Sequence, residues 1–406
     1  MNMATSDLQD VAIVGAGIIG ATVACALGQQ GLHITIIEAR EPELLNEAES
    51  DYDLRVLAVS PGSEMILRAL GAWDLVELER VCPYRQMQVW DAGGGGEITF
   101  DCLDVNEPRL GYIVENRAIQ NALIKRMHAS EEFTWRCPDA LSGFAVDDDG
   151  VTVELESGAR VRARLLVGAD GPRSCVRKLA GIVFRTRDYD QCALIANVAT
   201  ERSHNHTAWQ RFLADGVLAF LPLADGRSSI VWSTLQERAQ HLASLPDARF
   251  CEALAEAFDF RLGNIESCGP RAVFPLRGGQ AEPYVLPRVA LIGDAAHGIH
   301  PLAGQGANLG FMDAAALADA LTDTGRDIGS LRVLRRYERA RKGDNIAMML
   351  AMEGFRLLFG HQTLPLRYMR NIGLSLTDAA APVKRQLMRY AMGLSGERPR
   401  LARGYL

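Results

Sequence analysis

A glycine-rich turn between two short apolar runs, close to the start of the chain, restricts the fold more than any other feature. Residues 11–14 form an apolar run typical of a buried strand, and the turn Gly15-Ala-Gly-Ile-Ile-Gly20 follows it directly. The residues after the turn predict a helix, and a second apolar run at 33–37 predicts another strand. A strand, helix and strand within about thirty residues is the unit from which doubly wound α/β sheets are built.

The glycines of that turn and the acid after the second strand predict a ligand. Gly15 permits the tight turn, Gly17 lets a pyrophosphate approach the backbone, and Gly20 allows close packing of helix on strand. Glu38 ends the second strand, where a carboxylate can accept hydrogen bonds from both ribose hydroxyls and disfavours a 2′-phosphate. We therefore expect a dinucleotide, FAD or NAD rather than NADP. The alternative is a glycine-rich turn that binds nothing.

A second glycine-rich stretch, late in the chain, repeats the pattern of strand, turn and helix. Residues 289–292 form a short apolar run, as expected of a central strand in a parallel sheet. Asp294 follows its carboxyl end, where open α/β sheets bind ligands. After the glycines of 304–310, a strongly helical run begins at Asp313. The N–H groups at a helix start suit an anionic ligand, or a ring that gains negative charge during reaction.

Two arginines and an aspartate are further candidates for ligand contacts, each with a structural alternative. Arg55 lies between an acidic segment and an apolar run, where it could clamp a phosphate or form a surface salt bridge. Arg117 lies near the start of a predicted helix, where the dipole gives a cation no benefit, so it either contacts a ligand or faces solvent. Asp170 follows a predicted strand, and either it binds a ligand or, like Ser174, it caps a helix.

The strand and helix patterns predict an α/β fold in which a β-rich domain interrupts a Rossmann-like nucleotide-binding domain. Residues 84–101 are typical of a hairpin, strand-like runs continue through 188–280, and a helix is expected over 247–257. Towards the C-terminus the pattern is helical. The predicted nucleotide-binding domain comprises 8–83, 103–182 and 284–345, the β-rich substrate domain comprises 84–102 and 183–283, and a C-terminal helical region covers 346–406.

Composition and side-chain spacing argue against several other classes of protein. The net charge of −7 and the pI of about 5.7 argue against a nucleic-acid-binding protein. No two of the eight cysteines form a CxxC pair, and the histidine pairs 204/206 and 297/300 lack further ligand clusters, so we predict reduced thiols and no metal. The N-terminus lacks signal-peptide features, and no apolar run is long enough to span a membrane. We expect a cytoplasmic protein, either free or on the inner face of a membrane.

The C-terminal helices could bring the protein to a surface. Residues 345–359 place Met and Phe side chains on a mostly apolar helix, which could pack within the fold, form a dimer contact or face lipid. Residues 384–392 and 398–403 are basic on an otherwise acidic protein. A basic amphipathic helix could meet an anionic membrane surface.

Three motifs, in this order along the chain, resemble those of one enzyme family. Gly15–Gly20 looks like its FAD fingerprint, Gly168–Ser174 like its second motif, associated with FAD and the nicotinamide cofactor, and Gly293–Asp313 like its third, which contacts the ribityl chain and the flavin. The family is that of the single-component flavoprotein aromatic hydroxylases of the p-hydroxybenzoate hydroxylase type. Within it, His300–Asp313 and residues 391–404 are similar to the ubiquinone-biosynthesis branch.

The resemblance implies a Rossmann-like FAD-binding domain with an inserted β-rich substrate domain and C-terminal helices. It implies hydroxylation of the ring of a polyprenylated phenol or benzoquinol, with NAD(P)H and O2, through a C4a-hydroperoxyflavin kept from water. Pro301 and Gly304 would form the backbone loop at the flavin, and no side-chain base is assigned. The implied cofactor-binding residues are Gly15, Gly17, Gly20, Glu38 (adenosine ribose), Arg55 (pyrophosphate), Arg117, Asp170, Asp294 (ribityl hydroxyls), Gly304, Gly306 and Asn308.

Other functions and partners stay open at this point. The same fold could serve another FAD-dependent aromatic hydroxylase, or a flavin dehydrogenase or halogenase outside quinone synthesis, although the chain lacks a distinct second GxGxxG unit for NAD(P)H. A non-catalytic scaffold that binds flavin or lipid would carry a yellow chromophore without oxidising NAD(P)H. The partners expected of the hydroxylase are a prenylated phenolic molecule and O2. Contact with a membrane surface or a quinone-synthesis complex, and a homo-oligomer, are further options.

Overall fold

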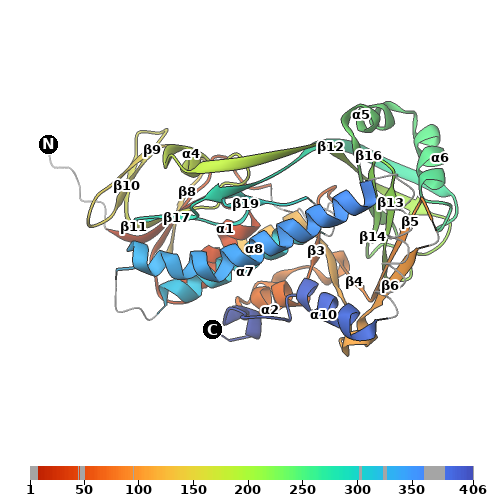
Figure 1. Ribbon diagram of the computed structural model, residues 1–406. Helices are drawn as coiled ribbons and strands as arrows, with labels where there is room; N and C mark the ends of the chain where they lie inside the picture. Colours follow the sequence, from red (N-terminus) through yellow and green to blue (C-terminus); the bar gives the residue numbers. More distant parts are fainter. Residues whose placement is uncertain are drawn as a thin grey trace.

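Two large β-sheets organise the chain and occupy opposite ends of the molecule (Figure 1). The computed structural model describes residues 8–43, 45, 51–94, 96–300, 304–322, 327–360 and 380–405. Helices α7 (Gln305–Leu321) and α8 (Leu331–Gly360) pack against each other, and α8 extends along the molecule from the first sheet toward the second (Figure 1).

The first sheet has a parallel centre formed by the predicted strand–helix–strand unit. Strand β1 pairs in parallel with β2 on one side and with β11 on the other, so that Val11 lies opposite both Ile34 and Leu165. Strand β18, predicted over 289–292, extends the parallel set beside β11. The sheet order is β17-β18-β11-β1-β2-β8, with β10 and β9 as an antiparallel extension. Its strands are β1 (Gln9–Val14), β2 (Ile34–Ile37), β8 (Phe133–Arg136), β9 (Leu141–Val146), β10 (Val151–Leu155), β11 (Arg160–Gly168), β17 (Val285–Leu286) and β18 (Val289–Leu291).

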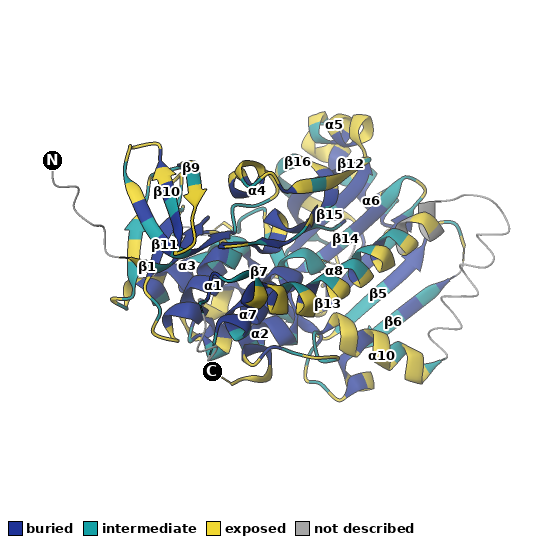
Figure 2. Cartoon of the chain, turned by 60° about the vertical axis from the view of Figure 1, so that its left-hand side comes forward, coloured by how far each residue is buried: buried dark blue, intermediate teal, exposed yellow. Residues whose placement is uncertain are grey.

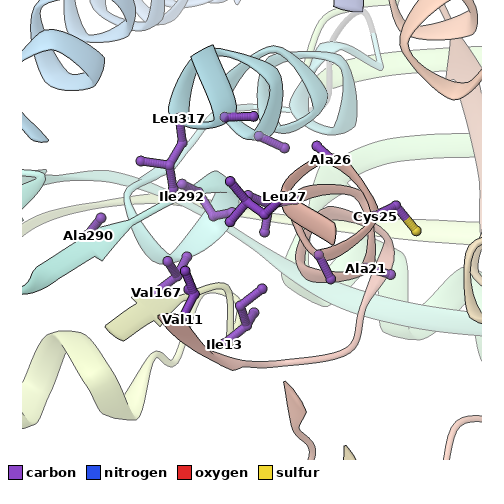
Figure 3. Packing of buried hydrophobic residues seen from close by; sticks show 14 of the residues in the cluster. Val11, Ile13, Ala21, Cys25, Ala26, Leu27, Val167, Ala290, Ile292 and Leu317 are labelled. Atoms are coloured by element: carbon purple, nitrogen blue, oxygen red, sulfur yellow. The ribbon is translucent and has the colours of Figure 1, made fainter. Parts of the chain in front are cut away.

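Apolar residues of the central strands are buried because helices cover the sheet. Helix α1 (Ile18–Gly28) packs on α3 (Asn116–His128) and on α7. Figure 3 shows side chains of the resulting core, with Leu27 of α1, Ile13 of β1 and Leu317 of α7 in one cluster. The core therefore lies directly beneath the glycine-rich turn that begins α1.

The second sheet is antiparallel apart from one pairing and has the order β19-β16-β12-β15-β14-β13-β5-β6. The hairpin predicted over 84–101 is confirmed, because β5 and β6 pair in antiparallel, and β5 joins β13 in parallel. Strands β12 and β16 are long and run between the two ends of the molecule (Figure 1). The strands are β5 (Gln86–Asp91), β6 (Glu97–Asp101), β12 (Val183–Thr200), β13 (Thr207–Leu213), β14 (Gly216–Pro222), β15 (Ser228–Leu235), β16 (Ile265–Glu282) and β19 (His297–Gly298).

Two helices cover one face of the second sheet. Helix α6 (Asp247–Ala257) has the bounds that its sequence predicts, and its Phe250 and Leu254 are fully buried. Helix α5 (Gln236–Ser244) was not predicted, because only its Ala239 and Leu242 are buried and the rest of its sequence is polar. The outer surfaces of both helices are exposed (Figure 2).

Smaller elements complete the fold beside the two large sheets. A three-stranded sheet of β3 (Val56–Val59), β7 (Gly111–Glu115) and β4 (Val81–Tyr84) lies in the order β3-β7-β4. Helices α2 (Pro61–Ala69), α4 (Cys175–Leu179) and α10 (Ala381–Ala391) and the short 3₁₀ turns η1 (Trp73–Leu75), η2 (Leu78–Arg80), η3 (Cys102–Val105), η4 (Gly293–Ala295) and η6 (Leu401–Arg403) account for the remaining regular structure of the described residues.

Helix α8 touches both ends of the molecule. Met348 and Met352 are buried against Val89 and Phe212 of the second sheet, so this part of the predicted apolar helix packs within the fold. Leu350, on the opposite side, is 66% exposed.

In the part of the chain that the structure describes, no helix combines the length and hydrophobicity needed to span a membrane. We retain the division at 84–102 and 183–283 as a proposal. The second sheet then lies in the β-rich domain except for its edge strand β19, which falls within 284–345.

Candidate functional site

The turn before α1 holds its three glycines for different steric reasons. Gly15 has a φ of 104°, and a Cβ there would lie 2.5 Å from the carbonyl oxygen of Ala169. A Cβ on Gly20 would lie 1.9 Å from the carbonyl oxygen of Gly15. A Cβ on Gly17 would meet no atom of the described residues within 4 Å. Gly17 is also the N-cap of α1, and no side chain caps this helix. The first turn of α1 therefore presents N–H donors beside open space.

Glu38 and helix α3 fix the same turn from two sides. The backbone N–H of Ala16 donates to Oε2 of Glu38 at 2.7 Å, and that of Arg40 donates to Oε1 at 3.3 Å. The side-chain amide of Gln120 donates to the carbonyl oxygen of Ala16 at 2.9 Å. Gln120 stands one turn after Arg117 on α3, so the start of that helix lies near the glycine turn. Sequence reasoning missed Gln120, because a glutamine on a helix carries no signal of its long-range partner.

The second glycine-rich stretch differs from the expectation in where its helix begins. We predicted a helix from Asp313, but α7 begins at Gln305, with Gly304 as its N-cap in the left-handed region at φ 61°. Gly306 and Asn308 therefore lie in the first turn of α7 and not in a loop. Glycine has a low intrinsic helix propensity, which misled the sequence reading, whereas burial of this segment favours the helix. Pro301, predicted to lie at the flavin, is outside the described residues.

Asn308 has a structural role that the sequence did not predict. Its Oδ1 accepts hydrogen bonds from the backbone N–H of Ser60 at 3.0 Å and from Oγ of Ser63 at 2.8 Å. Its Nδ2 donates to the carbonyl oxygen of Ala58 at 2.9 Å. Asn308 thus fastens the start of α7 to the end of β3, the strand that follows Arg55. Its predicted contact with the cofactor would be through the backbone.

The two glycine-rich stretches meet at Ile19, in the first turn of α1. A Cβ on Gly310 would lie 2.7 Å from Cδ1 of Ile19, and one on Gly293 would lie 3.2 Å from its Cγ2. The start of α1, the turn at Gly293 and the first turns of α7 are therefore neighbours. Neither α1 nor α7 has a side-chain cap or an acidic residue in its first turn. Two helix N-termini, neither with a side-chain cap, thus begin in one region.

Asp294 and Arg55 are two charged candidates for ligand contacts in this region. The side chain of Asp294 is solvent-accessible, yet the surrounding protein raises the pKa of Asp294 by desolvation, against the opposing charges of His297 and Arg55. The carboxylate is therefore accessible to a ligand at the carboxyl end of β18. The side chain of Arg55 is exposed. Much of the acidic segment before it lies outside the described residues, so the phosphate contact and the surface salt bridge both stay predictions.

The described contacts of Asp170 match the capping alternative. Its Oδ2 accepts hydrogen bonds from the N–H groups of Cys175 and Val176, at 2.6 and 3.1 Å, and Oγ of Ser174 accepts from Arg177 N–H at 3.0 Å. Oδ1 of Asp170 is buried with no hydrogen-bond partner among the described residues. That atom could still accept from a ligand, so the predicted contact stays a prediction.

The histidines serve as hydrogen-bonding side chains. His204 bonds the carbonyl oxygen of Leu223 through Nε2, and His300 bonds Oε1 of Gln191 through Nε2, at 3.2 and 3.1 Å. Burial lowers the pKa of His204. Across the described ranges, no group of three or more His, Cys, Asp or Glu side chains could hold a metal ion.

A buried group behind the Gly293 turn was not anticipated from the sequence. It consists of Asp313 of α7, His297, and Arg341 and Asn345 of α8. Arg341 and Asn345 are four residues apart on one helix, which places them on one face. That spacing is a local signal, but their partner on another helix is set by packing alone.

These residues fit FAD by the chemistry of their donors and by their steric openness. The open side of Gly17 and the N–H groups of α1 suit a pyrophosphate. Glu38 retains lone pairs for ribose hydroxyls, and Asp294 is an acceptor for the hydroxyls of a ribityl chain. The start of α7 offers N–H donors to a ring that gains negative charge. A long ligand with one anionic linkage and two polyol parts matches this series.

Comparisons with known proteins agree with this reading. A family model described as an FAD binding domain matches residues 9–350. The chain is 39% identical to the 3-demethoxyubiquinol 3-hydroxylase of Escherichia coli (strain K12), over 96% of this chain and 100% of the relative. It is 37% identical to the ubiquinone biosynthesis monooxygenase COQ6 of Homo sapiens, over 95% of this chain and 93% of the relative.

Solved structures share the fold at lower sequence identity. The probable FAD-dependent monooxygenase pqsL of Pseudomonas aeruginosa has a TM-score of 0.75 at 24% identity, over 91% of this chain and 100% of that one. HpxO of Klebsiella pneumoniae, solved with FAD and uric acid, has a TM-score of 0.74 at 19% identity, over 96% of this chain and 99% of that one. At this identity the likeness concerns the fold alone.

Proposed function

This chain belongs to the ubiquinone-biosynthesis branch of the FAD-dependent hydroxylases, and we propose that it hydroxylates the aromatic ring of a prenylated phenol or quinol with O2 and NAD(P)H. The observation that carries the proposal is the 39% identity to a demethoxyubiquinol hydroxylase along 96% of the chain. The two helix N-termini that begin beside Ile19 support it, because they suit the long anionic cofactor that the reaction requires.

The residues of the site have distinct tasks in this proposal. When bound, FAD supplies the transfer of electrons from NAD(P)H and the activation of O2. The N–H groups of α1 and the guanidinium of Arg55 bind the pyrophosphate, and Glu38 accepts hydrogen bonds from the ribose. Asp294 accepts hydrogen bonds from the ribityl chain. The N–H groups after Gly304 stabilise negative charge on the ring system, a preorganised electrostatic contribution.

An apolar wall next to the start of α7 would exclude water from the reacting atoms. Leu309 of α7 packs with Val89 and Phe212 of the second sheet and with Met348 and Met352 of α8. Methionine side chains adapt to ligands of varied shape. We propose that the ring of the substrate enters beside this wall, with its apolar chain along the same surface. Exclusion of water protects an oxygenating reaction from unproductive loss.

The proposal is tested with the purified holoprotein. FAD should co-purify or bind on titration, and a prenylated phenol should stimulate NAD(P)H oxidation and yield a product heavier by one oxygen atom, labelled when ¹⁸O₂ is supplied. Loss of the gene should cause a quinone precursor that lacks one oxygen to accumulate. A protein that binds no flavin would refute the proposal. Bound flavin without NAD(P)H oxidation, with any prenylated phenol supplied, would favour the scaffold.

We also propose that the protein contacts an anionic membrane through α10. Val383, Leu387 and Tyr390 are exposed at helical spacing, and Arg385 and Arg389 are exposed on the same short helix. An apolar stripe beside arginines is typical of a helix that lies in a bilayer interface. The wild type should sediment with phosphatidylglycerol vesicles, and the double variant R385E/R389E should not. Equal sedimentation of both would refute the role of α10.

The predictions of a homo-oligomer and of contact with a quinone-synthesis complex need separate measurements. Light scattering of the purified protein gives its mass in solution. Cross-linking in cells that make quinone, followed by identification of the joined peptides, tests the complex. A monomer without cross-linked partners would contradict both predictions.

A further inference from the structure

A carboxylate group inside the protein connects α7, α8 and the turn that carries Asp294. Asp313 of α7 is completely buried. Its Oδ1 accepts hydrogen bonds from Nε of Arg341 at 2.9 Å and from Nδ2 of Asn345 at 3.2 Å, both on α8. Its Oδ2 accepts from the backbone N–H of Gly293 at 3.2 Å and also bonds Nε2 of His297. One oxygen therefore faces α8 and the other faces the turn.

The residues of α8 in this group are themselves held in place. Arg341 donates from a terminal nitrogen to Oδ1 of Asn345 at 2.9 Å and from the other to Asp344 at 3.1 Å. Arg341 is 5% exposed and Asn345 is fully buried. Because the planar guanidinium is committed to three acceptors, it fixes the direction of the Asp313 carboxylate. A lysine could not reproduce this geometry.

The turn at Gly293, which donates to Asp313, needs a backbone conformation that favours glycine. Gly293 has a φ of 57° and packs on Ile19 of α1, and Asp294 follows it immediately. The hydrogen bond from Gly293 N–H to Asp313 sets the orientation of the peptide between Ile292 and Gly293, one residue before Asp294. Buried charge is a poor means of gaining stability alone, because removal from water opposes the attraction. The buried group around Asp313 therefore has a second role, which is to fix the orientation of Asp294.

We propose that Asp313 is a positioning residue for the cofactor turn, and that Arg341 and Asn345 of α8 set its position. This inference rests on the proposed function, in which Asp294 binds the ribityl chain. Through α8, the turn is also connected to the second sheet. Met348 and Met352 pack there, and Glu353 forms an ion pair with Arg187 of β12 at 2.8 Å. The cofactor turn and the second sheet thus share one rigid helix.

The test compares two Arg→Lys substitutions at buried arginines. Arg341→Lys removes the fork that holds Asp313. Arg288→Lys is the matched control, because Arg288 is 7% exposed and bonds both oxygens of Asp327, at 3.0 and 2.6 Å, away from the turn. We expect R341K to raise the Kd for FAD roughly tenfold, the effect of one weakened hydrogen bond to a charged group. The visible circular dichroism of bound FAD should change with it. R288K should lower the melting temperature but leave both FAD signals as in the wild type.

The outcomes separate this inference from the proposed function. If the wild type binds no FAD, the proposed function fails. If the wild type binds FAD and R341K binds it equally well with an unchanged spectrum, the positioning role is refuted and the group only stabilises the fold. Should R341K not fold, Asn345→Ala decides, because it removes the hydrogen bond from a neutral amide to Asp313 and one acceptor of Arg341, but leaves the ion pair between Arg341 and Asp313. A Kd for N345A equal to that of the wild type would then refute the inference.

Discussion

Replacing Gly17 by alanine separates the folding of the glycine turn from its use by a ligand. The backbone of Gly17 has φ −65° and ψ 175°, which any residue adopts, and an added Cβ would meet nothing within 4 Å in the described part of the chain. Alanine is a slightly poorer N-cap than glycine, so the apoprotein should lose about 0.5 kcal/mol. For a chain of this size that corresponds to a change in melting temperature of roughly 0.6 °C.

FAD binding should respond to G17A far more than stability does. If the pyrophosphate approaches the backbone at Gly17, the added methyl group occupies space that the ligand needs. Overpacking by one methyl group costs about 1–3 kcal/mol, which corresponds to roughly a 5- to 140-fold rise in the Kd for FAD. The expected result is therefore a nearly normal apoprotein with weakened cofactor binding.

The assay is a titration of apoprotein with FAD, followed by flavin fluorescence, together with thermal unfolding of the apo form. Gly354→Ala is the control, because Gly354 is exposed within α8 and its Cβ would also meet nothing within 4 Å. It should raise stability by about 1 kcal/mol through helix propensity and leave the Kd unchanged. An unchanged Kd for G17A would show that no ligand approaches this backbone. A large loss of apo stability would show that the space beside Gly17 is not open.

Three further predictions concern the interior. Gly20→Ala should prevent correct folding of the turn, seen as loss of cooperative unfolding, because its Cβ would lie 1.9 Å from the carbonyl oxygen of Gly15; a normal melting curve would contradict this. Burial alone would raise the pKa of Asp313, but its neighbours His297 and Arg341 lower the pKa by more, so that it falls from 3.8 to about 2. The ionised carboxylate therefore stabilises the fold by about 2 kcal/mol above about pH 4. That contribution is lost as the pH falls from 4 towards 2. D313N should lack this pH dependence in urea unfolding, and an equal pH slope in D313N and the wild type would refute the lowered pKa of Asp313. Met352→Ala should lower the free energy of unfolding by about 2–4 kcal/mol, measured by denaturant unfolding. Leu350→Ala, on the exposed face of α8, should change the free energy of unfolding by less than about 0.5 kcal/mol. Equal effects of the two substitutions would contradict the packing of α8.

Local pattern predicted the strand–helix–strand unit well, because its periodicity and its turn glycines lie within one short segment. The hairpin at 84–101 and helix α6 were predicted for the same reason. The start of α7 was misplaced because propensity scores glycine as unfavourable, whereas close packing of Gly310 on Ile19 makes a glycine necessary inside this helix. No local pattern could pair Asp313 with Arg341, since the contact exists only once α7 and α8 are packed together.

The glycines of the two motifs fall into two groups that the sequence cannot distinguish. At Gly15, Gly20 and Gly310, other protein atoms occupy the space that a side chain would need, so a larger residue would distort the fold. Among the residues that the structure describes, no atom lies within 4 Å of a Cβ added to Gly17, and the nearest to one added to Gly306 is 4.0 Å away. Both open glycines stand at the starts of uncapped helices, α1 and α7. The packed glycines, Gly15, Gly20 and Gly310, let these two helix starts approach each other at Ile19. The open glycines, Gly17 and Gly306, therefore mark the positions where one continuous ligand can contact both helix starts. Substitutions in the packed group should therefore act on folding, and those in the open group on FAD.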